Sequence, residues 1–147
     1  MKKVLIGMTL LPVLFACSKG PGQPPSEGDL RSGPAAAAVL EEGEKTALPD
    51  GGYFTWKFSE KPKLGVIIIN LQAFGPDGKP DTAYGLVGEF GMPSMKYHDS
   101  GPKPFILSRK GHYLLPVEFS MAGEWEIVIR VSREGKEIYE GRKLLTI

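Results

Sequence analysis

Residues 124–131 read Glu-Trp-Glu-Ile-Val-Ile-Arg-Val, and this stretch decides the fold class of the chain. Large apolar side chains occupy every second position, and charged side chains fill three of the four positions between them. Alternation with this period predicts a β-strand that buries one face in a core and turns the other to solvent. The Ala-Gly pair at 122–123 supplies a turn immediately before this strand.

Similar runs lie on both sides of this strand. Residues 67–73 and 113–119 alternate in the same way, although Pro116 lacks a backbone N–H and predicts a sheet edge or a bulge. Turn-forming residues separate the runs at 75–78, 109–111 and 133–135. The spacing predicts an all-β, immunoglobulin-like β-sandwich. We expect about seven strands, at 53–58, 63–74, 83–90, 105–108, 111–119, 124–132 and 136–147.

Composition excludes several classes of function. A chain of 147 residues has room for one ordinary domain, and its net charge of +1 argues against a nucleic-acid partner. The single Cys excludes an internal disulfide, a CxxC redox pair and a multi-cysteine zinc site. The sequence contains no Walker, HExxH, EF-hand or GxSxG motif. We therefore expect a protein that is not an enzyme.

The first residues have the pattern of an export signal. Lys2 and Lys3 precede thirteen uncharged residues at 4–16, a run shorter than the ~20 residues of a membrane span. The signal ends in Leu14-Phe15-Ala16-Cys17, which resembles the lipobox of bacterial lipoproteins. That resemblance implies cleavage of the signal peptide 1–16 and lipidation of Cys17, so that the membrane becomes a partner. By resemblance to the sorting patterns of Gram-negative lipoproteins, Ser18 in place of Asp implies the outer membrane facing the periplasm if the host is Gram-negative.

A tether is expected between the lipid anchor and the domain. Residues 18–50 contain five Gly, five Pro and five Ala and no aromatic residue. Such a composition does not bury a core, so we expect residues 17–50 to form a disordered linker with a reach of ~30 Å. The β-sandwich domain is then expected to span residues 51–147.

The residues that most suggest binding chemistry are Met92, Met95, His98 and Met121. If the strands alternate in direction, the segment 92–98 and the turn that carries Met121 lie at the same end of the sandwich, whereas His112 lies at the other end and is excluded. Thioethers and imidazole favour Cu(I) over hard divalent ions, which predicts a copper site of four ligands. In the competing interpretation these methionines fill gaps and close the core, since Met commonly serves that purpose. A contact with a protein or another ligand is the third alternative.

The domain also resembles the YtkA-like family of exported bacterial domains, which is similar to the FixH proteins of respiratory oxidase assembly. The matching pieces are Gly78-Lys79-Pro80, Met92-Pro93-Ser94-Met95 with His98, Gly111-His112-Tyr113, and Met121-Ala122-Gly123-Glu124-Trp125-Glu126. The resemblance implies an immunoglobulin-like fold, an envelope location and a link to copper handling or respiratory oxidase assembly. In many members a Gly and a His follow the second Met directly, whereas Lys96 and Tyr97 come before His98 here.

Two hypotheses of function follow. The first is a membrane-tethered, non-enzymatic envelope lipoprotein that handles Cu(I) or assists oxidase assembly. The second is a metal-free interaction or scaffold lipoprotein, in which an exposed strand edge near Pro116 recruits an envelope protein partner.

Overall fold

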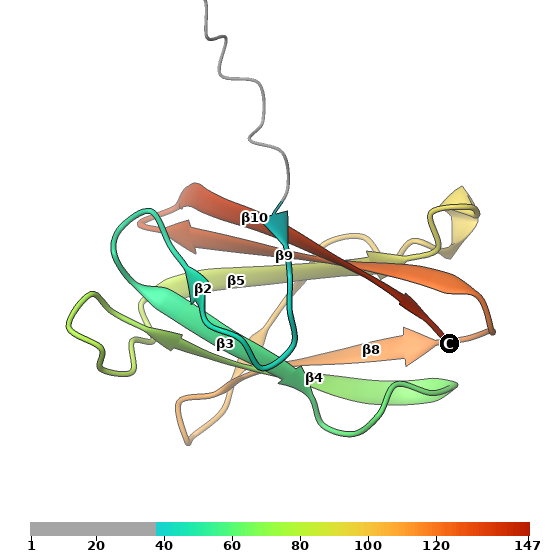
Figure 1. Ribbon diagram of the computed structural model, residues 1–147, viewed down its shortest axis with the longest axis horizontal. Coiled ribbons are helices and arrows are strands. Elements are labelled where there is room, and N and C mark those ends of the chain that lie inside the picture. The colour runs from blue at the N-terminus through green and yellow to red at the C-terminus, as the bar shows by residue number, and fades with distance from the viewer. Residues whose placement is uncertain (1–37) are drawn as a thin grey trace, which may run out of the picture. The chain divides into compact units, whose positions relative to one another are not determined.

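The computed structural model describes residues 38–147, which form two five-stranded sheets packed as a β-sandwich (Figure 1). The predicted all-β fold class is confirmed. The predicted signal peptide 1–16 and the predicted lipidation site Cys17 lie outside the described residues. Among residues 38–147, no helix has the length and apolar character needed to cross a membrane.

The first sheet contains β1, β10, β9, β5 and β6, in that order. Strand β1 runs parallel to β10, and the other neighbouring strands are antiparallel. The bounds are β1 (Ala38–Val39), β5 (Tyr84–Gly91), β6 (Lys103–Pro104), β9 (Glu124–Arg133) and β10 (Lys136–Thr146).

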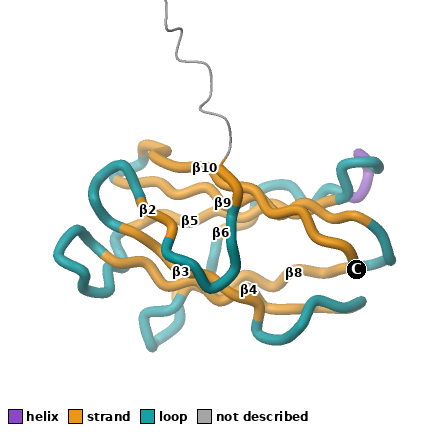
Figure 2. The backbone as a smooth tube through the Cα atoms, viewed as in Figure 1, coloured by secondary structure: helices purple, strands orange, loops and turns teal. Residues whose placement is uncertain are grey.

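The second sheet contains β2, β3, β4, β8 and β7, in that order, and all its neighbouring strands are antiparallel. The bounds are β2 (Thr46–Ala47), β3 (Tyr53–Phe58), β4 (Gly65–Phe74), β7 (Ile106–Leu107) and β8 (Tyr113–Phe119). One turn of 3₁₀-helix, η1 (Lys96–His98), projects from one end of the sandwich (Figure 2).

The core lies between the two sheets and is built from the alternating positions of the long strands. Trp125, Ile127 and Ile129 on β9 are at most 2% exposed, as the period-two pattern predicts. Phe119 of the opposite sheet meets the Trp125 ring edge-on, with ring centroids 5.2 Å apart. Burial of each such side chain contributes about 1.5–3 kcal/mol, so this interface supplies the main stabilisation of the domain.

The predicted boundary between tether and domain needs correction. Residues 38–50 were expected in the linker, but Leu40 is fully buried and Leu48 is 5% exposed, both within the core. Leu40 also donates its backbone N–H to the carbonyl oxygen of Arg142 at 2.8 Å. The fold therefore includes residues 38–50, because two apolar side chains and the short strands β1 and β2 attach this segment to the sheets.

The expected sheet edge at Pro116 is confirmed. Strand β7 pairs only with Tyr113 and Leu114 of β8, so within residues 38–147 no strand pairs with residues 115–119 of β8 on that side. Opposite Pro116, Ile68 directs its carbonyl oxygen to the N–H of Ser59, away from β8. The Ile68–Pro116 pair is therefore non-hydrogen-bonded, and the proline nitrogen faces the open edge.

Candidate functional site: the methionine loop

The segment 92–98 follows β5 and lies at the end of the sandwich where β8 turns into β9 and the chain reaches its C-terminus (Figure 1). The N–H of Met95 donates to the carbonyl oxygen of Met92, and the N–H of His98 donates to the carbonyl oxygen of Met95, both at 2.9 Å. Two bonds between Phe90 and Ser100 close the base of the loop. Consecutive tight turns thus hold the segment that the sequence singled out.

Met92 is a core residue. Its side chain is 6% exposed and belongs to the main apolar cluster. It lies against the turn that joins β8 and β9, where a Cβ on Gly123 would be only 2.6 Å from the Met92 Cε. Met92 therefore closes the core at this end, as the gap-filling interpretation predicts.

Met121 lies in that same turn and packs, partly buried, against the core. Its carbonyl oxygen accepts a 3.0 Å hydrogen bond from the indole Nε1 of Trp125. In the same turn, Gly123 exchanges two backbone hydrogen bonds with Ile147, at 3.0 and 3.1 Å. The structure therefore places Met121 at the end that the topological argument predicted, on a turn held by three hydrogen bonds.

Met95 and His98 have a more open setting. Together with Ser94 and Tyr97 they line a hollow that is open to solvent. Met95 is 44% exposed and Tyr97 is fully exposed, while His98 is half-buried. Of the four predicted ligand residues, Met95 and His98 thus share an accessible hollow, and Met92 and Met121 take part in core packing.

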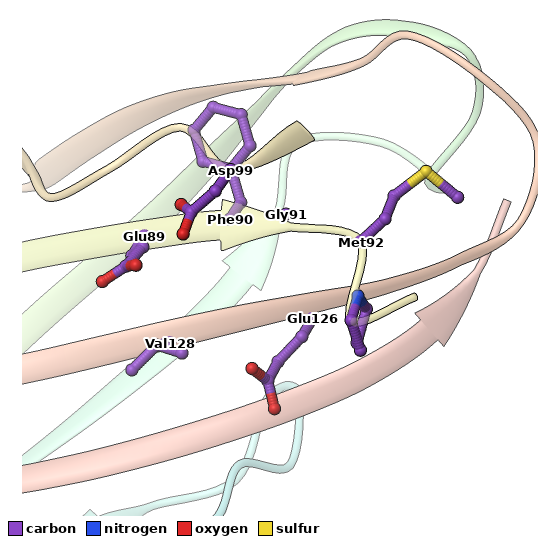
Figure 3. Close-up of a pocket in the computed structure, with 8 residues that line it drawn as sticks. Glu89, Phe90, Gly91, Met92, Asp99, Glu126 and Val128 are labelled. Atoms are coloured by element: carbon purple, nitrogen blue, oxygen red, sulfur yellow. The ribbon is translucent and has the colours of Figure 1, made fainter. Parts of the chain in front are cut away.

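A second hollow beside the loop was not predicted from the sequence. It lies over β5 and β9, and its carboxylates come from Glu89, Asp99 and Glu126 (Figure 3). In this view the Met92 side chain extends away from those carboxylates. The alternation of residues 124–131 placed Glu126 on the outer face of its strand, but it carried no information about Asp99.

Arginines neutralise most of this acidic surface. Arg130 donates to Glu89 at 2.7 Å and to Glu140 at 2.8 Å, while Arg142 donates to Glu140 at 3.0 Å and lies 3.5 Å from Glu126. The hydrogen bond from Arg130, followed by that from Arg142, holds the pKa of Glu140 below its ordinary value. Within residues 38–147, no three His, Cys, Asp or Glu side chains are arranged to hold a metal ion.

The opposite end of the sandwich carries a structural polar cluster. The Tyr84 hydroxyl donates to Asp50 at 2.8 Å, and Arg133 donates to Asp81 at 2.7 Å. Burial, and then the bond to Asp50, raises the pKa of Tyr84, whereas the backbone N–H of Ala83 and then Arg133 lower that of Asp81. His112, which the topology excluded as a ligand, instead contacts Asn70 at 3.0 Å through Nδ1.

Comparison with known proteins identifies no family. No protein-family model matches the chain, and no curated protein matches it by sequence. The similar solved structures include three copper-bound variants of P19 from Campylobacter jejuni. The first is 9% identical, with a TM-score of 0.48 over 72% of this chain and 95% of P19. The other two are 10% identical, with TM-scores of 0.45 and 0.43, and each covers 74% of this chain and 96% or 92% of P19.

Proposed function

We propose that this protein is a bacterial envelope lipoprotein whose sandwich domain binds Cu(I) and catalyses no reaction. The observation that supports this proposal is the open hollow that Met95 shares with His98. A thioether and an imidazole are both ligands that suit copper, and the thioether in particular selects Cu(I). Met92 and Met121 lie at the same end of the sandwich and complete the four-residue set predicted from the sequence, although both side chains pack against the core.

The position of the hollow suits a protein that passes its ion to a partner. The hollow is open to solvent, and the fully exposed Tyr97 is one of the residues that line it. In this proposal the lipid on Cys17 holds the domain near the membrane, on the outer membrane facing the periplasm if the host is Gram-negative. Delivery of copper during respiratory oxidase assembly is the role that the family resemblance implies.

Anaerobic titration with Cu(I) against a competing chelator tests the proposal, using residues 18–147 without a tag. We expect Met95→Leu and His98→Gln each to raise the Kd by at least ~10-fold, which corresponds to the loss of one ligand worth about 1.4 kcal/mol. Met92→Leu nearly conserves volume in the core and tests whether the buried methionine also binds the ion. A rise confined to the first two variants assigns Cu(I) to the exposed pair, and a rise in all three assigns it to the larger set. An unchanged Kd in every variant contradicts the proposal.

The second candidate is a metal-free interaction lipoprotein. The observation that favours it is a set of exposed apolar side chains on the outer face of β4 and on β7. The open edge of β8 is a weaker recruiting surface than the sequence suggested, because Pro116 removes a donor from it. A photo-crosslinker placed at Ile106, which is 62% exposed on β7, should then trap the same envelope protein with and without added copper. Capture that depends on copper would count against this candidate.

A further inference from the structure

The outer faces of the two sheets differ in chemistry. On the first sheet, Arg130 and Arg142 bridge carboxylates of three adjacent strands, so that a network of ion pairs crosses this face. On the second sheet, the corresponding face exposes aliphatic side chains. Val66 is 59% exposed, Ile68 40% and Ile106 62%.

The strand register makes these side chains one surface. Ile68 lies opposite Pro116, and Leu114 lies opposite Ile106, all directed away from the core. Pro116 is exposed and Leu114 is half-buried. We call this surface the outer patch; its members are Val66, Ile68, Ile106, Leu114 and Pro116. Contiguous exposed apolar surface of this kind marks an interaction site.

The patch favours recognition through its face rather than through its edge. Strand addition beside residues 115–119 would require a backbone donor at Pro116, which has none. A partner that packs flat against the side chains requires no backbone hydrogen bonds. Two sheets that pack face to face lie ~10 Å apart, a spacing that aliphatic side chains such as these fill.

Two charges flank the patch at opposite corners. Glu118 lies opposite Val66 at one end, and Lys57 lies opposite Asn70, four residues further along β4. Both side chains are exposed, and within the described part of the chain neither takes part in an ion pair. From strand rise and spacing, the two Cα atoms are separated by ~13 Å along the strands and ~10 Å across them. The midpoint of that diagonal falls on Ile68.

This arrangement is self-complementary. A two-fold axis that lies in the plane of the face, passes through Ile68 and runs perpendicular to the diagonal exchanges the positions of the two charges. Glu118 of each copy then lies over Lys57 of the other, and the apolar side chains meet between the two ion pairs. A symmetric pair of this kind is the commonest form of soluble oligomer. We propose that the protein forms a two-fold dimer in which the outer patch packs against the outer patch of a second copy.

Sedimentation velocity on residues 18–147, over ~1–500 μM, tests the dimer. We expect the wild type to shift from monomer to dimer within this range and Ile68→Lys to raise the dimer Kd by at least ~100-fold, because it buries a charge in the apolar centre. Leu144→Lys is the matched control, since Leu144 is 55% exposed but lies on the other sheet. It should leave the dimer Kd unchanged. A wild type that stays monomeric throughout, or equal effects of the two lysines, overturns the proposal.

Charge reversal tests the geometry of the pairing. Lys57→Glu and Glu118→Lys should each weaken the dimer by ~10-fold, since each places like charges opposite one another. The double variant should restore the wild-type Kd. Additive weakening in the double variant contradicts the proposed axis. Circular dichroism melts of all variants check that each one is folded. The dimer proposal is independent of copper, so neither result depends on the Cu(I) titration.

Discussion

Replacement of Gly88 by Ala should test how tightly the two sheets of the sandwich are packed. Gly88 is a buried, inward-facing position of β5. A Cβ at this position would lie 2.3 Å from the Cδ2 of Leu115 and 3.1 Å from the Cε2 of Phe105. Carbon atoms pack at about 3.5–4.0 Å, so the added methyl overlaps Leu115 by more than ~1 Å. Leu115 is 1% exposed, so any displacement of its side chain has to be accommodated within the core.

The expected cost is that of overpacking a core by one methyl group. Such insertions typically lower the free energy of unfolding by about 1–3 kcal/mol, and the short distance here places the loss near ~2 kcal/mol. For a domain of this size that loss lowers Tm by roughly 8–16 °C. Gly85→Ala is the matched control on the same strand. Its Cβ would lie 2.4 Å from the Ser132 Oγ, but that hydroxyl is on the outer face and can rotate away, so we expect less than ~1 kcal/mol.

Urea denaturation followed by Trp fluorescence measures both variants. The slope of the transition should stay unchanged, because the unfolded state exposes the same surface. The pair Gly88→Ala with Leu115→Ala should be more stable than the sum of the single losses by about 1–3 kcal/mol, because the shorter side chain makes room for the methyl. Additive losses, or equal effects of Gly88→Ala and Gly85→Ala, would refute the packing argument.

Three further outcomes are expected. Because the pKa values of Asp81 and Glu140 are lowered in the fold, both carboxylates should stabilise the protein above pH ~5, and this stabilisation should be lost as pH falls below ~4. In urea titrations, Asp81→Asn with Glu140→Gln should make the free energy of unfolding depend less on pH. An unchanged pH dependence would contradict this prediction. Because burial raises the pKa of Tyr84, stability should fall as pH rises above ~10. Tyr84→Phe should make the decrease of Tm above this pH smaller in thermal melts. An equally steep decrease in the variant would exclude Tyr84 as the cause. Gly123→Ala should lower the free energy of unfolding in urea by about 1–3 kcal/mol, because φ is +145° at this position. The loss should be the same in a Met92→Ala background. Full rescue by Met92→Ala would show instead that the contact between the new Cβ and the Met92 side chain causes the loss.

The long strands could be predicted because their side chains alternate over many residues. The 53–58 strand was predicted with its observed bounds, and the 124–132 strand ends one residue later than expected. Strands β1, β2 and β6 contain two residues each, so they have no alternation to detect. The boundary at 51 was wrong for a related reason. Leu40 and Leu48 are isolated apolar residues in a Gly-, Pro- and Ala-rich segment, and only the tertiary structure shows that the core includes them.

The candidate site was predictable as a location and less so as a set of ligands. Strand directions follow from turn spacing, so the turn with Met121 could be placed at the same end as the segment 92–98. Side-chain exposure does not follow from topology, because it depends on which way each turn residue points. Met92 and Met95 are three residues apart, yet one is 6% exposed and the other 44%. The outer patch could not be predicted in this way, because alternation identifies the side chains that face the core but does not show whether the opposite face of the strand is exposed.

The paired backbone bonds between Gly123 and Ile147 have a practical consequence for protein engineering. They hold the last residue beside the turn that contacts Met92, so any peptide fused after Ile147 begins next to the methionine loop. A polyhistidine extension would bring several extra imidazoles to the place where copper affinity is to be measured. For the fragment 18–147, which lacks Cys17, a purification handle therefore belongs ahead of β1, where the chain enters the opposite edge of the first sheet from β6.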